Sequence, residues 1–348
     1  MKFPISPSNA AQIVLGAVLS LAITAPLGAQ KPVVHRLEAT PGTVAYGYYW
    51  AEAKPAIRIR SGDFVDVETM LTNTPTGLER IGVKAADVPQ HLRDIVATDT
   101  GSLRGPGGHI LTGPIYVEGA DSGDVLEVRI RSISLPIAYG YNGCSGFVRE
   151  LCEQRTSTLI HLDRKKMTAE VAPGIVVPLR PFFGSIGVAP AAELGRVSSN
   201  PPGRHAGNLD NKELVAGTTL YIPVFVKGAL LEVGDGHAAQ GDGEVDQTAI
   251  ETNLEGRIQV IVRKDLKLDW PRGETPTHWI TMGTDTSLVV ATKTAIREMV
   301  KFLQERKGIT QTQAYQAASM AADVHITQLV DGNLGVHMMI PKRSLGGR

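Results

Sequence analysis

The sequence predicts a mostly β protein, built as a sandwich or barrel of short strands, with a helical α+β element at its C-terminal end. The first observation is a series of short segments in which apolar and polar residues alternate. The second is the set of glycine-, proline- and aspartate-rich turns between them, and the third is a change to a helical period of about 3.6 residues near Thr286. Because alternation buries one face of each strand, many such strands favour a sandwich or barrel.

The expected strands lie between turn sequences such as Ser61–Asp63 and Asp121–Asp124. In chain order they are Ala56–Arg60, Val125–Ile130, Gly174–Pro178, Thr218–Val224 and Arg257–Val262. A further strand follows His109, and we expect the pair Gly113–Pro114 to interrupt it, since proline cannot donate a ladder hydrogen bond.

Two helices are expected near the C-terminal end. The first has a core-facing stripe at helical spacing and ends before Gly308. The stripe consists of Val289, Thr292, Ile296, Met299, Val300 and Leu303. The second helix begins after Thr310, whose side chain can cap it, and runs to about Ala321.

Composition places the chain among ordinary globular proteins and limits its partners. Of its 348 residues, 43% are apolar and 20% charged, and 35 basic side chains balance 35 acidic ones. A chain without net charge has no global field to attract nucleic acid, so we expect a small neutral or mixed-charge partner. The sequence has no nucleophile elbow, nucleotide-phosphate loop, dinucleotide fingerprint or His-Glu-x-x-His motif.

The N-terminal segment differs from the rest of the chain. Lys2 precedes an uncharged stretch from Ala10 to Ala25, and small residues lie just before Gln30. This pattern predicts a signal peptide over residues 1–29, one mature domain over 30–348, and export to the periplasm or the exterior. The apolar stretch is short for a bilayer span of about 20 residues, so no membrane span is expected after cleavage. The alternative is an uncleaved N-terminal anchor.

Two cysteines, Cys144 and Cys152, lie eight positions apart. An oxidising compartment would allow them to pair, but the sequence leaves this disulfide open. Neither has a sequence neighbour that indicates a nucleophile, and two thiols do not make a four-ligand structural zinc site. A thiol hydrolase is therefore disfavoured.

The densest polar segment runs from Gly234 to Asp246 and contains four carboxylates and one histidine among four glycines. On an extended backbone Asp235 and His237 point to the same side, as do Asp242 and Glu244, so their side chains could converge on one ion. Carboxylate with histidine suits zinc or manganese, whereas carboxylates alone suit calcium or magnesium. The alternative is a solvated acidic turn.

Other polar residues suit the same kind of site. Glu251 follows on the adjacent polar stretch, Asp210 offers a further ligand, and Asn208 offers an amide that can bind a substrate. His109 precedes a strand after a glycine pair. Each has a structural alternative, because Asn and Asp commonly form turns with their own backbone and an isolated histidine is more often structural than catalytic.

Four motifs stand in a characteristic order along the chain. They are Ser61–Asp63, His109–Pro114, Gly207–Asp210 and the run from Gly234 to Glu251. Together they resemble the acetamidase/formamidase family, and the similarity extends from about His35 to Lys342. The chain departs from the family pattern around the Asn-Asp pair, where the family has two glycines and a methionine and this chain has Ala206 and Leu209.

The resemblance implies a metal-dependent hydrolase that cleaves the C–N bond of a small linear amide, such as formamide or acetamide, and releases ammonia and a carboxylate. It implies a β-rich fold, a homo-oligomer and a divalent metal, with zinc expected first and calcium as the alternative. The implied metal ligands are Asp210, Asp235 and His237, the implied catalytic residues are Glu244, His109 and Asp242, and the implied substrate-binding residue is Asn208. Which of these is ligand and which is base stays open.

The alternative function is an exported, non-catalytic protein that holds a metal or a small ligand on the same scaffold. The excess of carboxylates in the glycine-rich segment supports it, since carboxylates alone suit calcium. Metal binding without hydrolysis of any short amide, lactam or ester would identify such a protein.

A cleaved signal peptide predicts that the exported protein begins near Gln30. Intact-mass measurement and N-terminal sequencing of protein from a secreting host check this. A chain that still begins at Met1 would establish the uncleaved anchor instead.

Overall fold

The computed structural model describes residues 1–4, 31–99, 104–153 and 156–346. The chain divides into two compact units, Met1–Lys31 and Pro32–Arg348, and the second holds every described helix and strand. Most of the expected signal peptide lies outside the described residues. Within them, no helix has the length and apolar character needed to cross a bilayer.

A nine-stranded sheet forms one layer of the molecule. Its strand order is β1-β5-β17-β7-β15-β18-β19-β21-β20, and all of its pairs are antiparallel except β1 with β5. The strands are β1 Val34–Leu37, β5 Phe64–Thr69, β17 Leu254–Arg263, β7 Val125–Ser134, β15 Thr219–Pro223, β18 Arg272–Glu274, β19 His278–Asp285, β21 Leu334–Pro341 and β20 Asp323–Gln328.

A second sheet, of six strands, carries the segments that matter most for the site. It has the order β14-β12-β16-β6-β2, and β4 joins it by pairing with β6. Its strands are β14 Ala206–Asn208, β12 Phe182–Gly187, β16 Leu231–His237, β6 Ile110–Glu118, β2 Val44–Tyr46 and β4 Ile57–Arg60. Three short pairs complete the strands: β8 Tyr139–Gly143 with β9 Ser157–His161, β10 Thr168–Ala172 with β11 Ile175–Pro178, and β3 Tyr48–Tyr49 with β13 Val197–Ser198.

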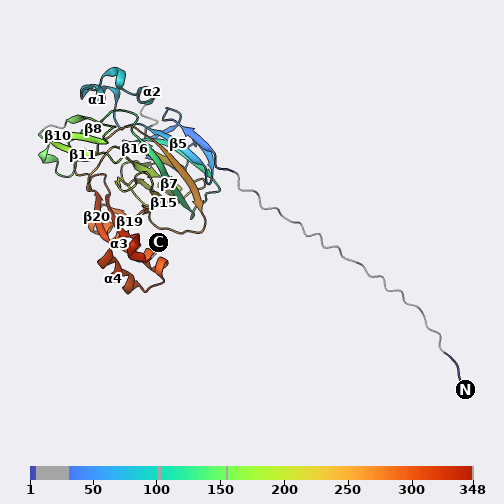
Figure 1. Ribbon diagram of the computed structural model, residues 1–348. Helices are drawn as coiled ribbons and strands as arrows, with labels where there is room; N and C mark the ends of the chain where they lie inside the picture. The colour runs from blue at the N-terminus through green and yellow to red at the C-terminus, as the bar shows by residue number, and fades with distance from the viewer. Residues whose placement is uncertain (5–30, 100–103, 154–155, 347–348) are drawn as a thin grey trace. The chain divides into compact units, whose positions relative to one another are not determined.

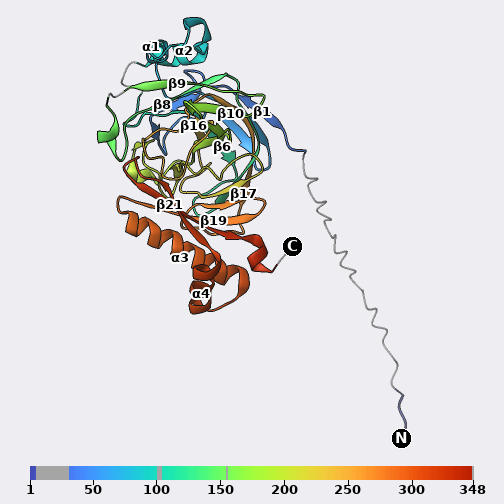
Figure 2. The same ribbon diagram turned by 60° about the vertical axis from the view of Figure 1, so that its left-hand side comes forward.

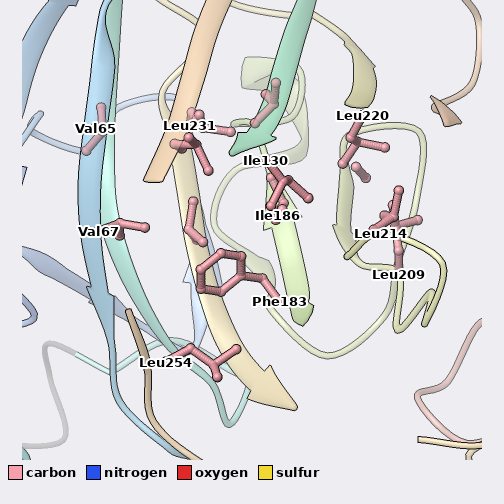
Figure 3. Packing of buried hydrophobic residues seen from close by; sticks show 14 of the residues in the cluster. Val65, Val67, Ile130, Phe183, Ile186, Leu209, Leu214, Leu220, Leu231 and Leu254 are labelled. Atoms are coloured by element: carbon pink, nitrogen blue, oxygen red, sulfur yellow. The ribbon is translucent and has the colours of Figure 1, made fainter. Parts of the chain in front are cut away.

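The main hydrophobic core lies between these two sheets (Figure 3). Val65 and Val67 of β5 approach it from the nine-stranded sheet, and Phe183 of β12 and Leu231 of β16 approach it from the six-stranded sheet. In β5 every second side chain is buried, as the alternation predicts, whereas every residue of β12 and β16 is buried. The molecule is therefore a β sandwich whose inner strands carry the site.

Two C-terminal helices cover the far part of the nine-stranded sheet (Figures 1 and 2). Helix α3, Leu288–Lys307, packs on β19 and β21 and ends at Gly308, which adopts the left-handed conformation. Helix α4, Gln311–Ala321, begins with a capping box formed by Thr310 and Gln313. Both helices lie where the sequence predicted them. The predicted stripe of the first is only partly right, because Val289 is 62% exposed and the buried face consists of Ala291, Ala295, Met299, Phe302 and Leu303.

The structure differs in two places from the secondary structure predicted from the sequence. Strand β6 continues through Gly113–Pro114, because a shift in its pairing with β16 at this point accommodates the missing proline donor. Two helices near the N-terminal end were not expected: α1, Pro75–Arg80, which Thr74 caps, and α2, Gln90–Thr98. Their buried leucines, Leu78 and Leu92, form a second core cluster.

Cys144 and Cys152 form a disulfide, with their Cα atoms 5.7 Å apart. It closes the loop between β8 and β9, an arm of the molecule in which Phe147 and Leu151 are exposed. The bond therefore stabilises a segment that has little apolar burial of its own.

Candidate active site

Strand β16 supplies the centre of the site. Asp235 and His237 lie two residues apart near its end, and Asp235 Oδ2 is 3.3 Å from His237 Nε2. Gly234 and Gly236 alternate with them, because a Cβ there would lie 2.7 Å and 2.5 Å, respectively, from a backbone carbonyl oxygen of a neighbouring segment. The glycine pattern thus reflects close packing of a buried strand and not a solvated turn.

His237 lies among three buried carboxylates. Its Nε2 is 3.3 Å from Glu251 Oε1 and 3.3 Å from Asp235 Oδ2, and its Nδ1 is 3.9 Å from Asp210 Oδ1. Glu251 reaches this position because its backbone pairs with that of His237 in an isolated antiparallel bridge. The exposed fractions of the four residues are only 1–4%, so water does little to screen their charges from one another.

Glu244 and Asn208 complete the group of residues expected from the sequence. Donor atoms of Asp210, His237 and Glu244 all lie within 4.8 Å of one another. Asn208, the last residue of β14, donates from Nδ2 to Asp210 Oδ2 over 2.9 Å. The structure therefore brings together residues from two separate sequence motifs.

Gln240 sets the orientation of the central imidazole. Its Nε2 donates to the Asp210 backbone oxygen over 2.8 Å, which leaves Gln240 Oε1 facing His237 Nδ1 at 2.9 Å. An oxygen there can only accept, so Nδ1 carries the proton and donates it. In the neutral ring, Nε2 is then free to act as a metal ligand or a proton acceptor.

His109 lies at the edge of this cluster. Its Nε2 is 3.8 Å from Asp235 Oδ1, and its Nδ1 is 3.1 Å from Ser199 Oγ. Ser199 also accepts from the His109 backbone amide. The serine thus fixes the ring, which is 13% exposed, beside the carboxylate.

Three of the clustered carboxylates have unusual backbone conformations. The φ angles of Asp210, Asp235 and Glu244 are 49°, 56° and 41°, in the left-handed region that non-glycine residues seldom adopt. Each such residue costs on the order of 1 kcal/mol, which surrounding structure must offset. Their coincidence at one point indicates a site shaped for binding rather than for stability.

Burial raises the pKa of three carboxyl groups at the site. Burial, together with the negative charges of neighbouring carboxylates, raises the pKa of Asp210 and of Glu244 well above the usual range. Burial likewise raises the pKa of Asp331 to about 6. Like charges held this close in the interior favour protonation or the binding of a cation.

The pKa values of Asp235 and His237 shift in opposite directions. Burial alone would raise the pKa of Asp235, but the nearby rings of His237 and His109 hold it below its usual range. Burial opposes a charged His237, yet Glu251 and Asp235 raise its pKa well above the ordinary value. The ionised form of Asp235 is therefore strongly stabilised by a positive charge beside it, whether a proton on His237 or a bound ion supplies that charge.

The donor set fits a metal ion. Four buried atoms of the cluster make no hydrogen bond among the described residues: Asp210 Oδ1, Glu244 Oε2, Glu251 Oε2 and His237 Nε2. Gly184 of β12 keeps the space between them open, because a Cβ there would lie 2.5 Å from both Asp210 Oδ1 and Asp235 Oδ2. Unpaired buried donors and acceptors are costly, and a divalent cation would satisfy them.

Asp242 departs from the sequence expectation. The prediction that Asp242 and Glu244 share an extended backbone is wrong, because Gly243 and Glu244 both have positive φ and turn the chain between them. Asp242 points away from the cluster to Lys212 Nζ at 3.0 Å and His325 Nδ1 at 3.1 Å. Asp242 could share an ion with His325 and His337, but the lysine ammonium already neutralises its charge.

Comparisons with known proteins show which family the chain belongs to. The model of the acetamidase/formamidase family matches residues 64–200 and 197–344 of the chain. The chain belongs to the acetamidase/formamidase family. This membership confirms the resemblance drawn from the four ordered motifs.

Curated family relatives match part of the chain. The acetamidase of Mycolicibacterium smegmatis is 26% identical over 235 residues, which cover 50% of this chain and 56% of that protein. The formamidase of Methylophilus methylotrophus is 29% identical over 196 residues, 39% of this chain and 47% of that protein. The chain thus spans about half the length of the curated relatives it matches.

Solved structures of family members match almost completely. A predicted acetamidase/formamidase from Thermoanaerobacter tengcongensis superposes with a TM-score of 0.76 at 27% identity, covering 90% of this chain and 99% of that one. An acetamidase from Bacillus halodurans gives a TM-score of 0.76 at 29% identity, covering 89% and 98%. The mostly β fold with C-terminal helices is therefore the family fold.

Ala206, which lies shortly before Asp210 in the chain, also has an unusual backbone conformation. Its φ is 65°, in the left-handed region, where a side chain carries a steric cost that glycine avoids. Its methyl group is fully buried in the main core, which offsets part of that cost.

Three contributors to the site were not named from the sequence. Gln240 lies within the acidic segment, and its role depends on an amide orientation that sequence spacing does not reveal. Gly184 lies between Phe183 and Ser185 in the buried strand β12. A glycine has no polar side chain that would mark it as part of a site. Asp331 comes from the turn between β20 and β21, far from Asp246 in sequence, and its carboxyl group and that of Asp210 affect each other's pKa.

We expect Gly184→Ala to weaken metal binding by on the order of 10- to 100-fold, because the added methyl group enters the space between Asp210 and Asp235. Metal analysis and isothermal titration of the purified protein measure this, with circular dichroism as a check on folding. Gly241→Ala is the matched control, since a Cβ at Gly241 meets nothing within 4 Å. Unchanged affinity in a folded Gly184→Ala protein would show that the ion binds elsewhere.

Proposed function

We propose that this chain is a metal-dependent amidohydrolase that cleaves the C–N bond of a linear amide and releases ammonia and a carboxylate. The observation that carries the proposal is the buried group of Asp210, Asp235, Glu244 and Glu251 around His237 in a member of this family. The names of the relatives, acetamidase and formamidase, support the amide as substrate.

The proposed ligands of the ion are His237, Asp235 and Glu251, with Asp210 completing the set. His237 Nε2 faces both Asp235 and Glu251 at 3.3 Å, and Asp210 Oδ1 borders the same space above Gly184. Imidazole together with carboxylates favours zinc, whereas calcium prefers oxygen ligands alone. When bound, such an ion polarises the amide carbonyl and lowers the pKa of water at the site.

Glu244 is the proposed general base. Its carboxylate is 6% exposed, and Oε2 makes no hydrogen bond to a described residue. Without a cation, burial and the neighbouring carboxylates favour its protonated form; a bound cation would balance those charges, so that Glu244 would be ionised and could accept a proton from the attacking water. The water oxygen bonds to the carbonyl carbon, the C–N bond breaks, and Glu244 returns the proton to the leaving nitrogen. General acid-base help of this kind contributes on the order of a hundred- to ten-thousand-fold.

Asn208 is the proposed binding group for the amide nitrogen. Its Nδ2 donates to Asp210 Oδ2, which fixes the side chain and leaves Oδ1 as a buried acceptor without a partner. A primary amide would donate an N–H to that oxygen and thereby direct its leaving group. His109, held by Ser199, stands beside Asp235 as a further proton-handling group.

We also propose that the protein acts after export, as a homo-oligomer. The N-terminal pattern and a disulfide between Cys144 and Cys152 support export, because disulfides persist in oxidising compartments. The family resemblance supports assembly. The N-terminal sequencing described above and size-exclusion chromatography with light scattering test the two proposals.

We expect the purified protein to release ammonia from formamide, acetamide or propionamide, and to lose this activity when a chelator removes the ion. Ammonia release is measured on metal-analysed protein before chelation, after chelation, and after zinc or calcium is returned. A γ-lactam needs a product assay because its opening releases no ammonia. A metal-loaded, folded protein that hydrolyses no amide would favour the non-catalytic binding protein.

Glu244→Gln should lower kcat by on the order of a hundred- to ten-thousand-fold, because the amide keeps the shape of the side chain but cannot act as a base. Metal content and melting temperature should remain close to those of the unmodified protein. Glu118→Gln, at an exposed position at the end of β6, is the matched control. Full activity of the Glu244→Gln protein would remove Glu244 from this role.

A further inference from the structure

A cavity with a volume of about 610 Å³ lies beside the buried cluster. Most of its lining comes from the β8–β9 hairpin, the β10–β11 hairpin and residues 239–250 after β16, and Arg180 and Lys212 complete it. A volume of this size is typical of sites for ligands much larger than formamide or acetamide. The proposed small amides would leave most of it empty.

The cavity borders the candidate active site through two of the site's residues. Glu244 and Gln240 both line it, and Ala249 and Ile250, which precede Glu251, form another part of its wall. Glu244 is the proposed base, and Gln240 orients His237. A substrate whose amide reached the cluster would therefore extend its remaining atoms into this cavity.

The wall away from the cluster is largely apolar. Its aliphatic side chains come from β9, β10, β11 and the residues after β16. They are Ile160, Val171, Val177, Pro178, Ala239, Val245, Ala249 and Ile250. Of these, Ile160 and Ile250 are 5% exposed. Such a surface gains free energy when it covers a hydrocarbon group.

Apart from Glu244, the proposed base, the charged residues of the wall already have polar partners. Lys212 Nζ lies 3.0 Å from Asp242 Oδ2, and Arg180 Nη2 lies 3.4 Å from Glu213 Oε2. Asp246 Oδ1 accepts from Asn142 Nδ2 over 3.3 Å. An ionic substituent would have to break one of these pairs, so the wall favours an uncharged one.

We propose that the preferred substrates of this chain are primary amides with an extended apolar acyl group, which binds against the wall formed by Ile160, Val171 and Val177. The inference rests on the proposed amide hydrolysis and names its substrate class. The acyl side is the one that fits, because the amide nitrogen leaves as ammonia and faces Asn208. The products are ammonia and a medium-chain carboxylate.

The test compares kcat/KM for acetamide, butyramide and hexanamide, with formamide included, in the metal-loaded mature protein. Burial of one methylene group is expected to raise kcat/KM by about fourfold, so hexanamide should exceed acetamide by on the order of a hundredfold. Succinamic acid, which carries a charge on the acyl side, should gain nothing over acetamide.

Val177→Phe tests the wall itself. Val177 lines the cavity, and a larger side chain there should lower the hexanamide-to-acetamide ratio by at least about tenfold. Val176→Phe is the matched control, because Val176 is the preceding residue of β11, is 59% exposed and does not line the cavity. It should keep the ratio of the unmodified protein, and melting temperatures show that both variants fold.

The outcomes separate the two proposals. Hydrolysis of acetamide with no rise along the series would overturn the acyl-binding wall and leave the amidohydrolase proposal in place. No hydrolysis of any amide would overturn the amidohydrolase proposal, and with it the substrate class. A rise along the series that Val177→Phe does not reduce would show that the acyl group binds somewhere other than this wall.

Discussion

The burial of several carboxylates around one imidazole is the constraint on which the rest of the structure depends. Asp210, Asp235 and Glu251 lie beside His237 in the interior, where like charges repel strongly and water cannot screen them. Such a group is stable only if the scaffold holds it firmly and a positive charge balances it. A rigid sandwich provides the first condition, and a divalent cation would provide the second.

The strands satisfy this constraint by close packing at glycine positions. Gly184 leaves room between the carboxylates, while Gly234 and Gly236 let neighbouring backbones approach the strand that carries Asp235 and His237. The left-handed conformations at the site show the accompanying cost, which the large core between the two sheets offsets. The core therefore supplies the stability, and the backbone conformations at the site lower it.

The segment after β16 contributes side chains both to the candidate active site and to the cavity beside it. Gln240 orients the central histidine, and Glu244 turns inward to the cluster, whereas Asp242 turns outward to Lys212. The same segment and the two small hairpins enclose the cavity beside the base. The side chains of the two hairpins shape the space that a substrate would occupy. The closed disulfide keeps one of those hairpins covalently connected.

The sequence by itself determined what depends on local patterns. Alternation and turns predicted the strands, helical spacing and the Thr310 cap predicted the C-terminal helices, and ordered motifs predicted the family. The tertiary structure alone decided that Glu251 and Asp331 join the cluster, that Asp242 does not, and that Gly184 keeps it open. These outcomes depend on long-range strand pairing and on backbone turns, which neighbouring residues in the sequence do not specify.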